Sequence, residues 1–179
     1  MDSKPAINRI WAMPNQWTFT IKPINQLIDR YLTPLGAGWI DPFAGKHSPA
    51  EIKNDLNPEF KHQYNLDALS FLKSLNGLYN GCLFDPPYSI TQASECYKSF
   101  GKDKLKINVA NMRYWAECKN QVARLLKPNG IVICCGWSSN GLGINRGFEL
   151  IEMLVVPHGG SKNDTIVTVE KKVNKINKL

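Results

Sequence analysis

Four aspartates follow short apolar runs of the chain, each at the point where a β-strand is predicted to end. They are Asp41, Asp55, Asp67 and Asp85. Ligands of open α/β sheets bind beside the carboxyl ends of the strands, so this placement predicts a ligand site lined by carboxylates. One such aspartate is commonly a turn residue or a helix cap. Four on successive strand ends favour a binding site over that structural role.

The most specific motif is the tetrapeptide Asp85-Pro86-Pro87-Tyr88. Two prolines after a strand cannot continue a hydrogen-bonded ladder, so they force a rigid, extended turn. Such a turn would fix the Asp85 carboxylate and the Pro86 carbonyl as two acceptors beside the Tyr88 ring. The exocyclic amine of a flat base needs two acceptors and a stacking surface to be aimed at an electrophile. The alternative is a structural proline turn capped by the aspartate.

Alternating helices and strands must position these residues. The apolar spacing predicts helices at 23–32, after Asp67 and at 111–127, and strands at 39–40, 81–84, 131–137, 148–156 and 165–169, with two more ending near Asp55 and Asp67. His158-Gly159-Gly160 begins a loop suited to a hairpin, which makes the last two strands antiparallel. We therefore predict an α/β protein with a mostly parallel seven-stranded sheet in a three-layer sandwich and a C-terminal antiparallel hairpin. The first crossover has only about six residues, too few for an ordinary helix.

The chain has 179 residues and is 43% hydrophobic, which predicts one folded domain over 1–179 with no room for a separate second domain. It contains no apolar run long enough to span a membrane, and its first 15 residues do not resemble a signal peptide. Its five cysteines lack CxxC spacing, which favours a reducing cytoplasm and argues against a metal site. The Lys-rich end, 171–179, is predicted to be a basic tail.

The net charge of +7 lies in the second half of the chain. Residues 1–97 carry 8 Lys/Arg and 9 Asp/Glu, whereas residues 98–179 carry 14 and 6. A basic surface attracts polyanions, and nucleic acid is the leading candidate partner. An ordinary solvated basic face is the alternative.

Together these segments resemble the S-adenosylmethionine-dependent amino-methyltransferases of the DPPY type, nearest the small phage- and prophage-encoded adenine-specific DNA methyltransferases. The resemblance covers roughly residues 19–170, through FTIKPI (19–24), DPFAG (41–45), NDLNP (54–58), Asp67-Ala68, DPPYS (85–89), KPNG (127–130), SSNGLG (138–143) and HGGSKND (158–164). It implies a Rossmann-like methyltransferase fold and transfer of a methyl group to adenine N6 of a flipped-out base.

The resemblance also implies which residues hold the cofactor. Asp41, Pro42, Phe43, Ala44 and Gly45 would form the loop under its methionine part, and Thr20, Ile21, Lys22 and Pro23 would close that end. Asp55 would accept the ribose hydroxyls, with Leu56 against the adenine ring. Asp67 would meet the adenine amino group, with Ala68 alongside. His47 stands where many relatives have a second glycine, and we expect it to be a loop residue rather than a base.

Catalysis is assigned to Asp85, Pro86, Pro87 and Tyr88, with Asp85 also beside the cofactor. The segment after them is predicted to be a mobile loop that contacts nucleic acid through lysines and aromatic rings. The predicted contacts are Ser89, Gln92, Tyr97, Lys98, Lys102, Lys104 and Lys106, together with Arg146, expected at the same edge of the sheet. The expected partner is duplex DNA, and a homodimer would enlarge the contact with it.

Three other functions compete with this one. Small DPPY-type proteins of similar length also methylate guanine N2 in ribosomal RNA, although those more often carry phenylalanine at the position of Tyr88. A catalytically silent nucleic-acid-binding subunit would have no need of the tetrapeptide or of the strand-end acids. A dinucleotide-dependent oxidoreductase would need G-x-G-x-x-G after the first strand, and DPFAGK does not supply it.

Overall fold

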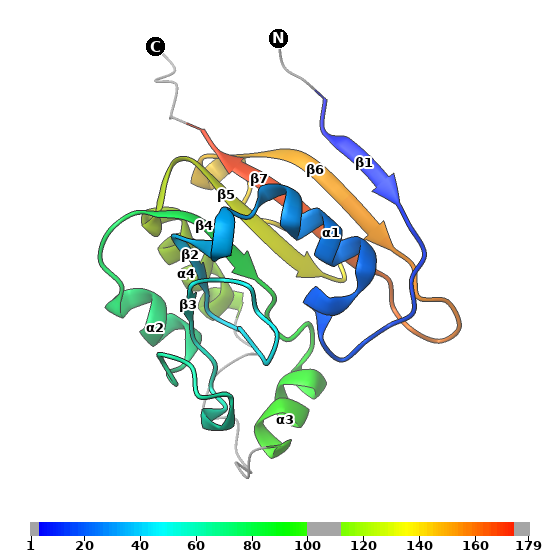
Figure 1. Cartoon of the computed structure of the whole chain (residues 1–179), viewed down its shortest axis with the longest axis horizontal. Coiled ribbons are helices and arrows are strands. Elements are labelled where there is room, and N and C mark those ends of the chain that lie inside the picture. The colour runs from blue at the N-terminus through cyan, green and yellow to red at the C-terminus, as the bar shows by residue number, and fades with distance from the viewer. Residues whose placement is uncertain (1–3, 100–111, 174–179) are drawn as a thin grey trace.

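The computed structural model describes residues 4–99 and 112–173 (Figure 1). Seven strands form one sheet in the order β1-β6-β7-β5-β4-β2-β3. The strands are β1 Ala6–Arg9, β2 Trp39–Asp41, β3 Ile52–Lys53, β4 Tyr79–Phe84, β5 Leu126–Gly136, β6 Phe148–Val156 and β7 Thr165–Lys172; the helices are α1 Lys22–Tyr31, α2 Ala68–Ser74, α3 Ile90–Ser99 and α4 Met112–Leu125.

Only β7 runs against its neighbours, pairing antiparallel with both β5 and β6. The other pairs are parallel. The predicted mostly parallel sheet with a C-terminal hairpin is therefore confirmed. All parallel strands end at one edge of the sheet, called here the carboxyl edge, and the loops that follow β2, β3, β4 and β5 begin there.

The sheet is covered on both faces, as Figure 1 shows with α1 in front of it and α4 behind it. Alternate residues of β4 point to opposite faces, so Leu83 packs in the cluster with α1 while Cys82 and Phe84 pack in the cluster with α2 and α4. On α1, the apolar spacing buries Ile24, Leu27 and Ile28 and leaves the opposite side exposed. In the described part of the chain, no helix has the length and apolar character needed to cross a membrane.

Three sequence predictions about elements were wrong. Residues near Asp67 form no strand, because Tyr64 makes only an isolated bridge to Asn54. The seventh strand is β1 instead, a short parallel strand at the edge of the sheet whose four residues are all exposed. Residues 90–99, predicted to lie in a mobile loop, form α3, and the Ser89 hydroxyl accepts the Gln92 N–H in its first turn.

The connection from β5 to β6 crosses the sheet as an irregular segment, with only a short 3-10 helix at Ile144–Arg146. Glu170 of β7 accepts the N–H groups of Leu142 (2.5 Å) and Gly143 (3.0 Å). Lys119 of α4 donates to the carbonyls of Asn140 (2.8 Å) and Gly141 (2.9 Å). Side-chain hydrogen bonds therefore hold this crossover where related arrangements use a packed helix.

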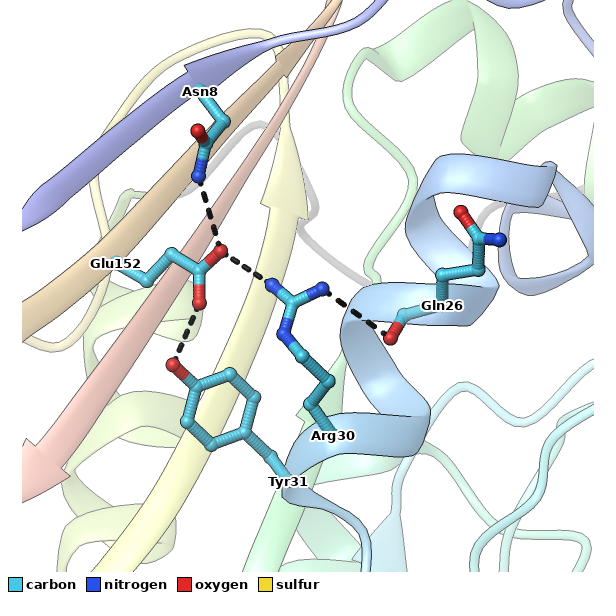
Figure 2. Close-up of polar contacts among 5 residues, drawn as sticks. All are labelled: Asn8, Gln26, Arg30, Tyr31 and Glu152. Atoms are coloured by element: carbon cyan, nitrogen blue, oxygen red, sulfur yellow. Dashed lines mark hydrogen bonds and ion pairs between the residues drawn. The ribbon is translucent and has the colours of Figure 1, made fainter.

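A buried carboxylate fixes α1 on the sheet (Figure 2). Glu152 of β6 is 7% exposed and accepts hydrogen bonds from Tyr31 (2.6 Å), Arg30 (2.5 Å) and Asn8 of β1 (3.4 Å). Burial and the bond to Glu152 raise the pKa of Tyr31 to about 12, so its hydroxyl stays protonated and able to donate. This network joins the N-terminal strand, the first helix and β6 around one charge.

Replacing Glu152 by alanine is expected to lower the free energy of unfolding by about 1–3 kcal/mol, because it removes a charged acceptor and leaves the Tyr31 hydroxyl without its partner. Urea denaturation measures this loss. Glu149→Ala is the matched control, since Glu149 lies on the same strand and is exposed. Equal losses in the two variants would contradict the role given to Glu152.

Candidate active site

A pocket of about 620 Å³ opens at the carboxyl edge of β2, β3 and β4. This volume is in the range of sites that bind small organic ligands. Its wall combines residues after these three strands with others from the N-terminal segment, α3 and α4, among them Gln16, Trp17, Thr18, Phe19, Pro42, Phe43, Ala44, Gly45, Asp55, Leu56, Asp67, Ala68, Asp85, Pro86, Pro87, Tyr88, Gln92, Tyr114 and Trp115.

Most residues predicted to hold a cofactor lie in this wall. Pro42, Phe43, Ala44 and Gly45 follow β2, Asp55 and Leu56 follow β3, and Asp67 and Ala68 begin α2. The structure thus brings together residues that are up to 26 positions apart between Pro42 and Ala68. Their assigned roles toward a cofactor stay predictions.

Gly45 takes a conformation that favours glycine, with φ +51°. A Cβ atom added there would lie 3.4 Å from the ring of Trp17. The left-handed backbone costs a residue with a side chain about 1–2 kcal/mol. The Gly45 N–H donates to the Asp55 carboxylate at 2.9 Å, which holds this turn against the segment after β3.

Asp41 lies behind the wall rather than in it and is fully buried. One of its carboxylate oxygens accepts the Phe43 N–H at 2.8 Å, and the other accepts the Ser48 hydroxyl at 2.6 Å. Burial raises the pKa of Asp41 to about 7, although these hydrogen bonds lower it. The side chain therefore shapes the loop 41–48 from beneath.

Asp55 and Asp67 combine a local structural bond with a place in the pocket wall. The two Asp55 oxygens accept the N–H groups of Gly45 (2.9 Å) and Asn57 (2.8 Å), and burial raises the pKa of Asp55. Asp67 caps α2 by accepting the Ser70 N–H at 3.1 Å. A carboxylate has about four acceptor positions, so both can also accept hydrogen bonds from a ligand.

The Asp85-Pro86-Pro87-Tyr88 turn follows β4, and all four residues line the pocket. The Tyr88 hydroxyl donates to Asp85, and the Thr18 hydroxyl makes a second hydrogen bond to the same carboxylate. Burial raises the pKa of Asp85, and these two hydrogen bonds oppose the rise. The Tyr88 ring meets Trp137 edge-on, with 5.7 Å between the ring centres.

The N-terminal contribution differs in position from the expectation. Residues 16–19 line the pocket, whereas Thr20, Ile21, Lys22 and Pro23 are absent from its wall. Ile21 and Pro23 are buried toward the core as α1 begins, and the Thr20 hydroxyl donates to the carbonyl of Trp17. The helix start therefore supports the wall from behind.

Sequence reasoning missed the aromatic part of the wall. Trp17 lies edge-on to both His47 and Phe60, with ring-centre distances of 5.4 and 5.9 Å. The ring of Trp115, on α4, lies near the ring of Phe43, with 6.0 Å between the ring centres. No sequence motif marked Trp17, Phe60 or Trp115 as a pocket residue. His47 is an exposed loop residue on the rim, as expected.

The residues predicted to contact nucleic acid are divided. Gln92 lines the pocket and accepts the Tyr88 N–H at 2.7 Å, while Ser89 lies directly before α3 and accepts the Gln92 N–H. Tyr97 and Lys98 belong to α3, and the positions of their side chains are not described. Lys102, Lys104 and Lys106 lie outside the described residues, as do 174–179 of the expected tail.

The prediction that Arg146 lies at the same edge as the pocket was wrong. It comes directly before β6, whose first residue Phe148 pairs with Lys172, at the end of β7. Because β7 is antiparallel, this is the opposite edge of the sheet. The guanidinium donates to Asn120 of α4 and to the Leu142 carbonyl, so Arg146 fastens the β5–β6 crossover. Across 4–99 and 112–173, no His, Cys, Asp and Glu side chains form a metal-binding group of three or more.

Comparisons with known proteins bear on the fold. A scan against protein-family models finds no match, and neither does a search of curated proteins. TrmN from Thermus thermophilus matches with a TM-score of 0.54 at 16% identity, over 86% of this chain and 49% of that chain. The candidate methyltransferase YhhF from Escherichia coli matches with a TM-score of 0.52 at 12% identity, over 85% of this chain and 83% of that chain. The fold is that of the Rossmann-like methyltransferases.

A third solved structure with this fold contains a ligand. SMU.776, a candidate methyltransferase complexed with S-adenosylhomocysteine, matches with a TM-score of 0.52 at 14% identity, over 82% of this chain and 48% of that chain. This chain spans about half the length of TrmN and of SMU.776.

The raised pKa of Asp41 predicts a pH-dependent stability. Because the folded chain holds this proton more tightly than the unfolded chain, the stabilisation is complete below pH 4 and is lost as the pH rises through about 7. Asp41→Asn should therefore gain about 2–4 kcal/mol of unfolding free energy relative to wild type between pH 4 and pH 8. Urea denaturation at both pH values measures it.

The control for this measurement is Asp164→Asn, because Asp164 is exposed in the loop between β6 and β7. Its difference from wild type should stay constant with pH. A constant difference for Asp41→Asn as well would show that the buried carboxyl does not hold the proton.

Proposed function

We propose that this chain is an S-adenosylmethionine-dependent methyltransferase that methylates the exocyclic N6 amine of adenine in DNA. The observation that carries the proposal is the joint pocket. Residues after β2 and β3 suit the parts of a nucleoside-containing cofactor, and the Asp85-Pro86-Pro87-Tyr88 turn after β4 lies in the same wall. The methyltransferase fold supports a shared use of this edge.

The chemistry of the wall fits the cofactor. Asp55 offers remaining acceptor positions for ribose hydroxyls, and Leu56 and Ala68 offer apolar contact for a flat ring next to the Asp67 carboxylate. Gly45 lets the backbone approach the ligand closely. When bound, S-adenosylmethionine supplies a methyl carbon activated by its sulfonium group.

The tetrapeptide suits an amine as acceptor of the methyl group. Asp85 lines the pocket and accepts a hydrogen bond from the Tyr88 hydroxyl, so its carboxylate is within reach of donors that enter the pocket. Two N–H groups of a base would be held by Asp85 and the Pro86 carbonyl, which leaves the nitrogen lone pair directed at the methyl carbon. Asp85 would also stabilise the positive charge that develops on nitrogen before its proton leaves.

The test is methyl transfer from labelled S-adenosylmethionine to unmethylated duplex DNA, single-stranded DNA and ribosomal RNA, with the products digested to nucleosides for mass spectrometry. We expect N6-methyladenine from DNA. N2-methylguanine from RNA would replace the proposed substrate by a ribosomal RNA. No product and no cofactor binding by calorimetry would favour a silent nucleic-acid-binding subunit.

Asp85→Asn should lower kcat at least about 100-fold, since an amide cannot accept both hydrogen bonds or stabilise positive charge. Calorimetry should show a cofactor affinity within about threefold of wild type, because the residues after β2 and β3 that would hold the cofactor are unchanged. Tyr88→Phe keeps the stacking ring and should lose less activity. Asp29→Asn on the exposed side of α1 is the control. Full activity in Asp85→Asn would overturn its role.

A further inference from the structure

Two tryptophans are exposed at the carboxyl edge, although this residue type is usually buried for much of its surface. Trp11 is 59% exposed and Trp137 is 43% exposed, whereas Trp39 in the core is 1% exposed. Trp137 follows β5 and contacts Tyr88 of the pocket wall edge-on. Trp11 follows β1, at the far side of the same edge.

The backbone around Trp11 is fixed even though its side chain is exposed. Ile10 donates to the Val155 carbonyl at 3.0 Å, and Ala12 donates to the Pro157 carbonyl at 3.2 Å. The Ala12 carbonyl contacts one ring nitrogen of His158 at 2.8 Å. A frayed end would not be held on both sides in this way, so the indole is presented on a rigid support.

His158 extends this support into the hairpin. Its second ring nitrogen contacts the Thr165 hydroxyl at 2.8 Å, which ties the end of β6 to the start of β7. Gly159 takes a left-handed conformation, with φ +72°, and a Cβ added there would be in ordinary contact with the indole nitrogen at 3.5 Å, so the loop passes next to Trp11. The exposed loop also carries Lys162, a cation available to a phosphate.

The strand order places Tyr88, Trp137, the hairpin and Trp11 in succession along this edge. Three strand spacings separate β5 from β1, a distance of about 14 Å. Each indole can stack on a base of any type, and every base in a single strand has an exposed face. A base pair inside a duplex does not offer that face, so these rings suit unpaired nucleotides.

We propose that Trp137 and Trp11 form a stacking track for a single strand of nucleic acid that leads away from the pocket. This deepens the proposed function, on which it rests, by naming an unpaired strand as the substrate. The target base would enter at Tyr88, and neighbouring bases of the same strand would stack on Trp137 and then on Trp11. Stacking on the two indole rings would provide the affinity for the nucleic acid. Lys162 of the hairpin loop and Arg9 of β1 are exposed near the proposed path of the nucleic-acid strand.

The test measures binding by fluorescence anisotropy of a labelled twelve-residue oligothymidylate, an oligouridylate and a blunt twelve-base-pair duplex. Neither single strand contains a purine, so binding is observed without methyl transfer. Trp11→Ala and Trp137→Ala should each weaken single-strand binding roughly 5- to 100-fold and duplex binding less than about twofold. Tighter binding of the oligothymidylate identifies the single strand as DNA, and tighter binding of the oligouridylate identifies it as RNA.

Three comparisons separate stacking from other roles. Trp137→Phe keeps a ring and should lose less affinity than Trp137→Ala. The slope of log affinity against log salt should not change, because no phosphate contact is lost. Ile144→Ala is the control, since Ile144 is 66% exposed but lies before β6 at the opposite edge.

The proposal is overturned if wild type binds neither single strand, if the two variants bind them like wild type, or if duplex binding falls as much as single-strand binding. Circular dichroism melting confirms that each variant is folded. Failure of methyl transfer with the expected binding losses would reject the proposed function and leave the track. Methyl transfer with unchanged binding would reject the track alone.

Discussion

The pocket depends on one buried carboxylate that has no direct part in its wall. Asp41 holds Phe43 and Ser48, and its own carbonyl accepts the Asn54 N–H at 2.9 Å. The loop after β2 is thereby folded back on β3, where Asp55 takes up the Gly45 N–H. Parallel strands are usually joined by a crossover helix, and in this short connection hydrogen bonds to Asp41 and Asp55 hold the loop instead.

The residues of the pocket wall come from two sets of elements. The residues after β2, β3 and β4 follow strands of the core, so their backbone positions are set by the sheet. Trp17, Gln92 and Trp115 come from the N-terminal segment, α3 and α4, which meet the pocket from outside the sheet. The segments after β3 and β4 contribute the acidic groups Asp55 and Asp85, and the outer segments contribute the aromatic rings of Trp17 and Trp115.

The sequence predicted the parts of the structure that rest on local chemistry. The acids after β3 and β4, the double-proline turn and the hairpin at His158 have short-range causes and were found in their predicted places. Asp67 instead caps α2 with no strand before it, and Asp41 lies behind the wall. The position of Arg146 could not be predicted, because it depends on where an irregular crossover passes the sheet. The strand at Ala6–Arg9 was not predicted, because it pairs with β6, which is far away in the sequence. The place of Trp137 beside the pocket could not be predicted either, because it depends on the contact of its ring with Tyr88.

The edge strand β1 also has a consequence for the order of folding. Asn8 and its partner Glu152 are 144 positions apart, so β1 has no pairing partner until the chain has been synthesised as far as β6. Contacts of such long range form late, since the entropy of closing the loop must be offset first. β1 therefore leaves the ribosome before β6 and can join the sheet only after β6 has been made, so Trp11 reaches its place late in folding.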